Sequence, residues 1–129
     1  MAKILVVDDE LGIRVSLWRA LEFSGHKVTL AKDGEEGDKL FRENPTDLVI
    51  TDLVMPKKEG LEFMSGLLVD FPDLKILVIS GGGVKASSKD IELLLDTAQT
   101  RGAVKTFAKP FELHEILACV RDLLAADAD

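Results

Sequence analysis

The sequence predicts an α/β fold in which a parallel β-sheet is covered by helices on both faces. Three short apolar runs have the length of strands and show no alternation between polar and apolar positions, at residues 4–7, 48–50 and 76–79. Strands that are buried on both faces have this pattern. Segments with helical periodicity lie between the runs, so strand and helix alternate along the chain. These observations together indicate a doubly wound α/β domain.

Ten elements are expected in alternation. Each helix is recognised by apolar residues at spacings of three and four, and its end by glycine or proline. In order, the elements are strand 4–7, a helix ending at Ser24-Gly25, strand 26–31, a helix between Asp33-Gly34 and Asn44-Pro45, strand 48–50, a helix from Gly60 to Pro72, strand 76–79, a helix over roughly 87–100, strand 104–108 and a helix carrying residues 113–124.

Length and composition narrow the class of protein. The chain has 129 residues, of which 47% are apolar and 30% charged, so we expect residues 1–129 to form one globular domain with no output domain. The net charge of −7 argues against a nucleic acid or an anionic membrane as partner. Cys119 is the only cysteine, which excludes an internal disulfide and fits a reducing compartment. With no signal peptide or long apolar run, a cytoplasmic location is expected.

Polar side chains occur where four of the expected strands end. Asp8 and Asp9 follow the first strand, Asp52 ends the third, Ser80 the fourth and Lys109 the fifth. The functional crevice of an open doubly wound sheet lies beyond the carboxyl ends of its strands. We therefore expect these five side chains to lie close together.

This combination of side chains suits a divalent cation and a phosphoryl group. Three neighbouring carboxylates repel one another unless a cation neutralises them, and an all-oxygen ligand set favours Mg²⁺ or Mn²⁺. A hydroxyl and an ammonium beside the metal form a pocket for an anion. A carboxylate such as Asp52 can then act as a nucleophile and form an aspartyl-phosphate.

Each of these residues also has a simpler interpretation. Asp8 and Asp9 can stabilise the start of the first helix, as can Glu10. Asp52 and Ser80 can be turn residues, and Lys109 can be a solvated charge. The metal site is favoured because all of them occur together.

Four motifs in order resemble the receiver domain of two-component response regulators, in particular a stand-alone, chemotaxis-regulator-like receiver. The motifs are Val6-Val7-Asp8-Asp9-Glu10, Thr51-Asp52-Leu53-Val54-Met55-Pro56 with Gly60, Val78-Ile79-Ser80, and Ala108-Lys109-Pro110-Phe111. The resemblance covers nearly the whole chain. It implies a flavodoxin-like fold with five strands in the order 2-1-3-4-5.

The resemblance also implies a role for each matching residue. Asp52 would be the phosphoacceptor, and Ser80 and Lys109 would contact the phosphoryl group. Mg²⁺ would be held by Asp9, Asp52 and the backbone carbonyl of Val54, with Asp8 acting mainly through a metal-bound water. The Lys109-Pro110 bond would be cis. The donor would be a sensor histidine kinase, a histidine phosphotransfer protein or a small acyl phosphate.

Two further features concern the partner surface and the switch residue. Leu11, Val15 and Trp18 form a second apolar stripe on the first helix, where receivers commonly meet their phosphotransfer partner; partial burial under neighbouring loops is the alternative. Thr106 occupies the place of the aromatic residue that typical receivers use as a switch. Phe107 cannot simply replace it, because adjacent strand residues point to opposite faces.

The function predicted is a stand-alone phosphoacceptor switch that acts through another, unknown protein. Self-catalysed phosphotransfer to Asp52 and slow dephosphorylation would be its only enzymatic activities. One rival is an interaction adaptor that keeps the fold but signals without phosphate, which Thr106 favours. Another is a flavin or nucleotide carrier, which Asp8 and Asp9 disfavour because they would repel the ligand's phosphate.

Overall fold

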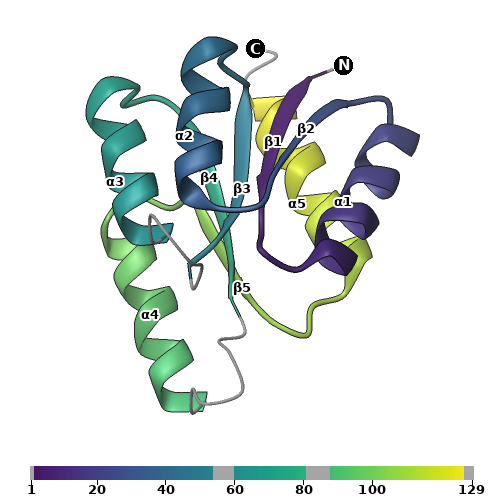
Figure 1. Cartoon of the computed structure of the whole chain (residues 1–129). Helices are drawn as coiled ribbons and strands as arrows, with labels where there is room; N and C mark the ends of the chain where they lie inside the picture. The colour runs from purple at the N-terminus through teal and green to yellow at the C-terminus, as the bar shows by residue number, and fades with distance from the viewer. Residues whose placement is uncertain (1, 54–59, 81–87, 127–129) are drawn as a thin grey trace.

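A single parallel sheet lies between two layers of helices (Figure 1). The computed structural model describes residues 2–53, 60–80 and 88–126. The elements are β1 (Lys3–Val7), α1 (Leu11–Phe23), β2 (Lys27–Ala31), α2 (Gly34–Glu43), β3 (Leu48–Asp52), α3 (Gly60–Asp70), β4 (Lys75–Ser80), α4 (Ser88–Thr100), β5 (Lys105–Ala108) and α5 (Leu113–Ala126).

The strands are ordered β2-β1-β3-β4-β5, and every neighbouring pair is parallel. The expected order is therefore confirmed. The chain moves outward from β1 to β2 and then returns to the other side of β1, so the topological switch lies between β1 and β3. Val7 pairs with Thr51 in this register. Asp8 and Asp52, one residue further along each strand, are thereby placed side by side.

The sheet separates two hydrophobic cores, since alternate residues of each strand point to opposite faces. Leu5 and Val7 pack with residues of α2, α3 and α4. Ile4 and Val6 pack with residues of α1 and α5. Figure 1 shows these two layers of helices on either side of the strands. Burial on both faces explains why the three central strands are continuously apolar.

Turn residues end or begin the helices where the sequence predicted. Gly25 has φ of 97°, a conformation that suits glycine, and its N–H donates to the carbonyl of Glu22 at 2.9 Å just after α1. Asp33 is the N-cap of α2, and its Oδ1 accepts a hydrogen bond from the Glu36 N–H at 2.8 Å. None of the helices in the described ranges combines the length and apolar character needed to cross a bilayer.

Candidate functional site

The loop between β1 and α1 holds Asp8 in a fixed and buried position. Its side chain has no exposed surface. Oδ1 accepts a hydrogen bond from the Glu10 N–H at 2.8 Å, and the Asp8 carbonyl accepts one from Nη1 of Arg14 at 2.7 Å. The turn is therefore secured by its own carboxylate and by a cation from the first helix.

Asp52 lies at the tip of β3, next to Asp8 across the switch. Its side chain is 5% exposed, and Oδ1 accepts a hydrogen bond from the Leu53 N–H at 2.7 Å. Thr51 Oγ1 donates to the Asp52 carbonyl at 2.8 Å. The Gly60 N–H donates to the Leu53 carbonyl at 3.0 Å, so the start of α3 returns directly to the end of the strand.

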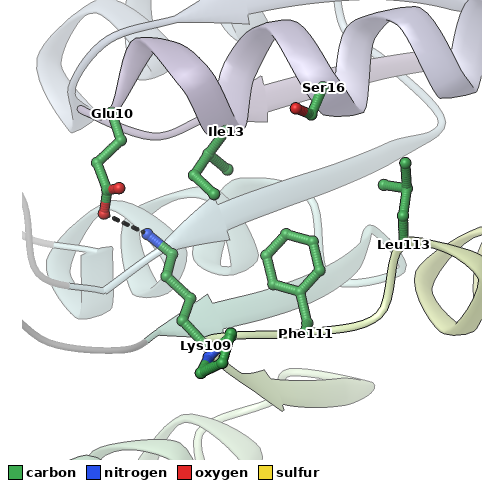
Figure 2. A pocket seen from close by; sticks show the side chains of 7 residues that line it. Glu10, Ile13, Ser16, Lys109, Phe111 and Leu113 are labelled. Carbon is green, nitrogen blue, oxygen red and sulfur yellow. Dashed lines mark hydrogen bonds and ion pairs between the residues drawn. The ribbon is translucent and has the colours of Figure 1, made fainter.

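Lys109 follows β5 and joins three carboxylates from two other segments. Its Nζ lies 2.9 Å from Asp8 Oδ2, 3.1 Å from Asp52 Oδ2 and 3.1 Å from Glu10 Oε1. Figure 2 shows the lysine extending toward Glu10 at the start of α1. The Lys109 N–H also donates to the Ser80 carbonyl at 3.0 Å, which anchors the end of β5 to β4.

Burial and the neighbouring charges shift the pKa values of Asp8 and Lys109. Burial raises the pKa of Asp8 to about 6, and the hydrogen bonds from Glu10 and Lys109 offset this only in part. Burial alone would lower the pKa of Lys109, but the hydrogen bond to Asp8 and the charge of Asp52 outweigh it, so the pKa lies above its ordinary value of 10.5. The ammonium therefore stays charged at neutral pH.

Ser80 and Asp9 complete the crevice from opposite sides. Ser80 ends β4, is fully buried, and its Oγ has no hydrogen-bond partner within the described part of the chain. A buried hydroxyl without a partner is costly unless a ligand supplies one. Asp9 lies on the exposed rim.

The oxygen atoms at this site fit a hard divalent cation. Asp8, Asp9, Glu10 and Asp52 each offer a carboxylate oxygen, and these atoms all lie within 4.8 Å of one another. Carboxylate oxygens at such spacing, with an exposed rim that leaves room for water, are the ligands that Mg²⁺ and Mn²⁺ prefer. No His or Cys belongs to this group.

The structure thus gathers the predicted Asp8, Asp9, Asp52, Ser80 and Lys109 in one crevice. Asp8 also has a turn role, since its Oδ1 accepts a hydrogen bond from the Glu10 N–H, whereas the side chain of the N-cap residue Glu10 makes no capping hydrogen bond. Val54 lies outside the described residues, so its carbonyl stays a prediction.

The remaining predicted positions lie beside the crevice. The Lys109-Pro110 bond is cis, as expected. Thr106 pairs with Val78 of β4, whose side chain belongs to the core under α2–α4, whereas Phe107 packs in the core under α1 and α5. The expectation that they face opposite sides is confirmed. On α1, Leu11 is 65% and Trp18 38% exposed, and Val15 is partly buried.

Two contributors were not predicted from the sequence. Glu10 contacts Lys109, whereas the sequence indicates only a helix-terminal charge at this position, and Arg14 holds the Asp8 carbonyl. For Glu10, the available signal was its position directly after Asp8-Asp9. Arg14 has no comparable signal, because arginine at the fourth position of an amphipathic helix is usually a solvated charge.

Comparison with known proteins gives a consistent result. Residues 4–121 match the sequence model of the response regulator receiver domain. The chain is 41% identical over 122 residues to the response regulator MprA of Mycobacterium sp. (strain KMS), an alignment covering 95% of this chain and 50% of the relative.

Two solved structures show the same architecture over nearly their whole length. A response regulator receiver domain protein from Clostridium thermocellum superposes with a TM-score of 0.86 at 28% identity, covering 99% of this chain and 98% of that one. The chemotaxis protein CheY4 of Vibrio cholerae superposes with a TM-score of 0.79 at 27% identity, covering 95% and 98%.

The chain therefore belongs to the response regulator receiver family of two-component systems, whose general function is that of a phosphoacceptor switch. It spans half the length of the curated relative MprA.

Proposed function

We propose that Asp52 accepts a phosphoryl group and that this modification changes how the domain binds a partner protein. The observation that carries the proposal is the convergence of Lys109 and the neighbouring carboxylates on Asp52, with the buried hydroxyl of Ser80 at the end of the adjacent strand. Receivers as a class use Mg²⁺ at such an acidic pocket. Here Asp8, Asp9 and Asp52 would hold it, and when bound it would neutralise charge on the phosphoryl oxygens.

The protein's own side chains account for the rest of the chemistry. Asp52 forms the new P–O bond while the P–N bond of a phosphohistidine donor breaks, and its electron pair stays on the imidazole, which takes a proton. Lys109 offers a compact cation to one phosphoryl oxygen, and Ser80 offers its O–H to another. The donor we propose is a sensor histidine kinase or a histidine phosphotransfer protein, with a small acyl phosphate as a substitute.

The test is phosphorylation by a small acyl phosphate with Mg²⁺, followed by intact-mass measurement. The wild-type protein should gain one phosphate that Asp52→Asn abolishes. Asp73→Asn, a change at an exposed aspartate in the turn before β4, should leave the gain unaffected. Phosphate on the Asp52→Asn protein, or no phosphate on the wild type, would contradict the proposal.

We also propose that Leu11, Val15 and Trp18 form the surface that receives the protein donor. The exposure of Leu11 and Trp18 and their place on the helix that directly follows the acidic loop support this assignment. Trp18→Glu should slow phosphotransfer from a phosphohistidine donor without slowing labelling by an acyl phosphate. Phe23→Glu is the matched control, because Phe23 is 94% exposed at the other end of α1. Equal rates for all three proteins would remove α1 from the interface.

A phosphate-independent adaptor is the second candidate, and the presence of Thr106 in place of an aromatic favours it. Partner binding measured with the phosphorylated and the unphosphorylated protein distinguishes the two candidates. If the protein takes up phosphate but its binding to a partner is the same in both forms, the adaptor role is correct.

A further inference from the structure

Glu10 and Lys109 form an ion pair at one end of a cavity between α1 and the segment after β5. The cavity has a volume of about 510 Å³. Ile13 on one side and Phe111 and Leu113 on the other give it apolar walls, and the paired charges form its polar end (Figure 2). Because both charged groups come from segments that carry the crevice, the pair connects the phosphoacceptor site with this surface.

The ammonium of Lys109 is enclosed by three carboxylates. A lysine ammonium has three N–H donors. Two of them go to Asp52 Oδ2 and Glu10 Oε1, each at 3.1 Å, and Asp8 Oδ2 lies 2.9 Å away as an ion-pair partner. A phosphoryl oxygen at Asp52 therefore competes for this ammonium with the carboxylates that already surround it.

Exposure decides which carboxylate withdraws. The side chains of Asp8 and Asp52 are 0% and 5% exposed, whereas that of Glu10 is 60% exposed. A buried carboxylate that loses its cation stays desolvated, but the Glu10 carboxylate is rehydrated at once. Breaking the Glu10 pair therefore costs least.

The free Glu10 carboxylate has a favourable alternative position. Glu10 is the N-cap residue of α1, its side chain makes no capping hydrogen bond, and the first turn of the helix has no acidic residue. The positive end of the helix dipole therefore lies beside it without a compensating negative side chain from that turn. Hydrogen bonds from the Glu10 N–H to Asp8 and from Arg14 to the Asp8 carbonyl keep the backbone in place while the side chain moves.

We propose that Glu10 is a positioning residue that holds Lys109 in the unphosphorylated protein and is displaced from it by the phosphoryl group on Asp52. The proposal rests on the function proposed above for Asp52. It makes Glu10 a competitor of the phosphoryl group for the same cation. The displacement of the Glu10 side chain opens the polar end of the cavity beside α1 only when Asp52 is modified.

The test is the binding of beryllofluoride, an analogue of the phosphoryl group, at Mg²⁺ concentrations that saturate every variant. Glu10→Gln should bind the analogue about two- to five-fold more tightly, which is the range expected for the loss of one partly exposed ion pair. Glu112→Gln is the matched control, because Glu112 is an exposed acidic residue of the segment between Lys109 and α5. Its affinity should equal that of the wild type.

A double-mutant cycle separates the ion pair from a general effect of charge. In a Lys109→Ala background, Glu10→Gln should no longer tighten binding, because the cation for which Glu10 competes is absent. Tightening by the same factor in that background would overturn the proposal, as would an unchanged affinity of Glu10→Gln.

The NMR signal of the Glu10 side-chain carboxyl carbon provides a second measurement that does not depend on variants. It should move when beryllofluoride is added to the Mg²⁺-loaded protein, beyond the shift that Mg²⁺ alone produces. A signal that stays fixed with the analogue bound would overturn the proposal for Glu10 and leave the role of Asp52 intact. If the wild-type protein binds no analogue and takes up no phosphate, the role of Asp52 is wrong instead.

Discussion

Asp8 is the most confined charge of the crevice, and its burial has a cost that depends on pH. Its pKa is about 6 in the folded protein against an ordinary value of 3.8. Between these values the folded protein keeps a proton that the unfolded chain has lost. The free energy of unfolding contributed by this group therefore falls as pH rises from about 4 to about 6, by about 3 kcal/mol at most. Lys109 adds no slope in this range, since its raised pKa matters only in alkaline solution.

The change Asp8→Asn should remove the pH dependence that Asp8 gives to the free energy of unfolding. Without divalent cations, the difference in the free energy of unfolding between Asp8→Asn and the wild type should shift in favour of the variant, by up to about 3 kcal/mol, as pH rises from about 4 to about 7. Urea unfolding of both proteins at several pH values, in the presence of a chelator, measures this difference in the free energy of unfolding. A difference that is the same at every pH would show that burial does not raise the pKa of Asp8 in this way.

Helix α3 begins so close to the end of β3 that its first residue has no room for a side chain. A Cβ added at Gly60 would lie 2.3 Å from the carbonyl oxygen of Asp52 and 2.4 Å from the Cα of Leu53. Both neighbours are backbone atoms, so the strand or the helix would have to move. The position of the phosphoacceptor is thus tied to a glycine eight residues later in the chain.

Gly60→Ala should therefore affect both stability and the site. We expect a loss of about 1–3 kcal/mol in the free energy of unfolding, as is typical of overpacking, together with slower labelling of Asp52 by an acyl phosphate. Gly66→Ala in the same helix is the control, because a Cβ there meets nothing within 4 Å. It should stabilise the protein by up to about 1 kcal/mol, since alanine favours helix over glycine. Equal behaviour of the two variants would exclude the steric explanation.

The whole molecule has a net charge of −7, and part of that charge is concentrated in the crevice. Among the described residues this cluster holds four carboxylates, and three of them contact the ammonium of Lys109, so the folded state retains repulsion that the unfolded chain relieves. A ligand that binds only the folded protein stabilises it by mass action. A divalent cation should therefore have a measurable effect on unfolding.

Mg²⁺ at ten times its Kd should add about 1.4 kcal/mol to the free energy of unfolding, which corresponds to a rise in Tm of roughly 5 °C for a domain of this size. Asp9→Asn should reduce the rise with little change in the metal-free Tm, because Asp9 is exposed. Differential scanning calorimetry against sodium chloride of equal ionic strength provides the measurement. An equal rise with the monovalent salt would show that screening alone is responsible.

The sequence alone determined the fold class and most members of the site, Glu10 and Arg14 excepted. Continuous apolar runs identified the central strands, because only a sheet covered on both faces needs them. Gly25 and Asp33 marked helix ends through local backbone chemistry. Asp8, Asp52, Ser80 and Lys109 were recognised because strand ends of a parallel sheet meet at one edge. The strand order itself came from the resemblance to receivers, since local patterns do not say which strands are neighbours.

Only the tertiary structure decided how those charges are shared. Glu10 and Lys109 are 99 residues apart in the chain, and their contact depends on where α1 begins relative to the end of β5. The full burial of Asp8 and the support of its carbonyl by Arg14 likewise depend on how the first helix packs against the sheet. The physical reason is that residue type and spacing determine which groups reach an edge of the sheet, whereas distances and exposure between groups from different segments are set by packing.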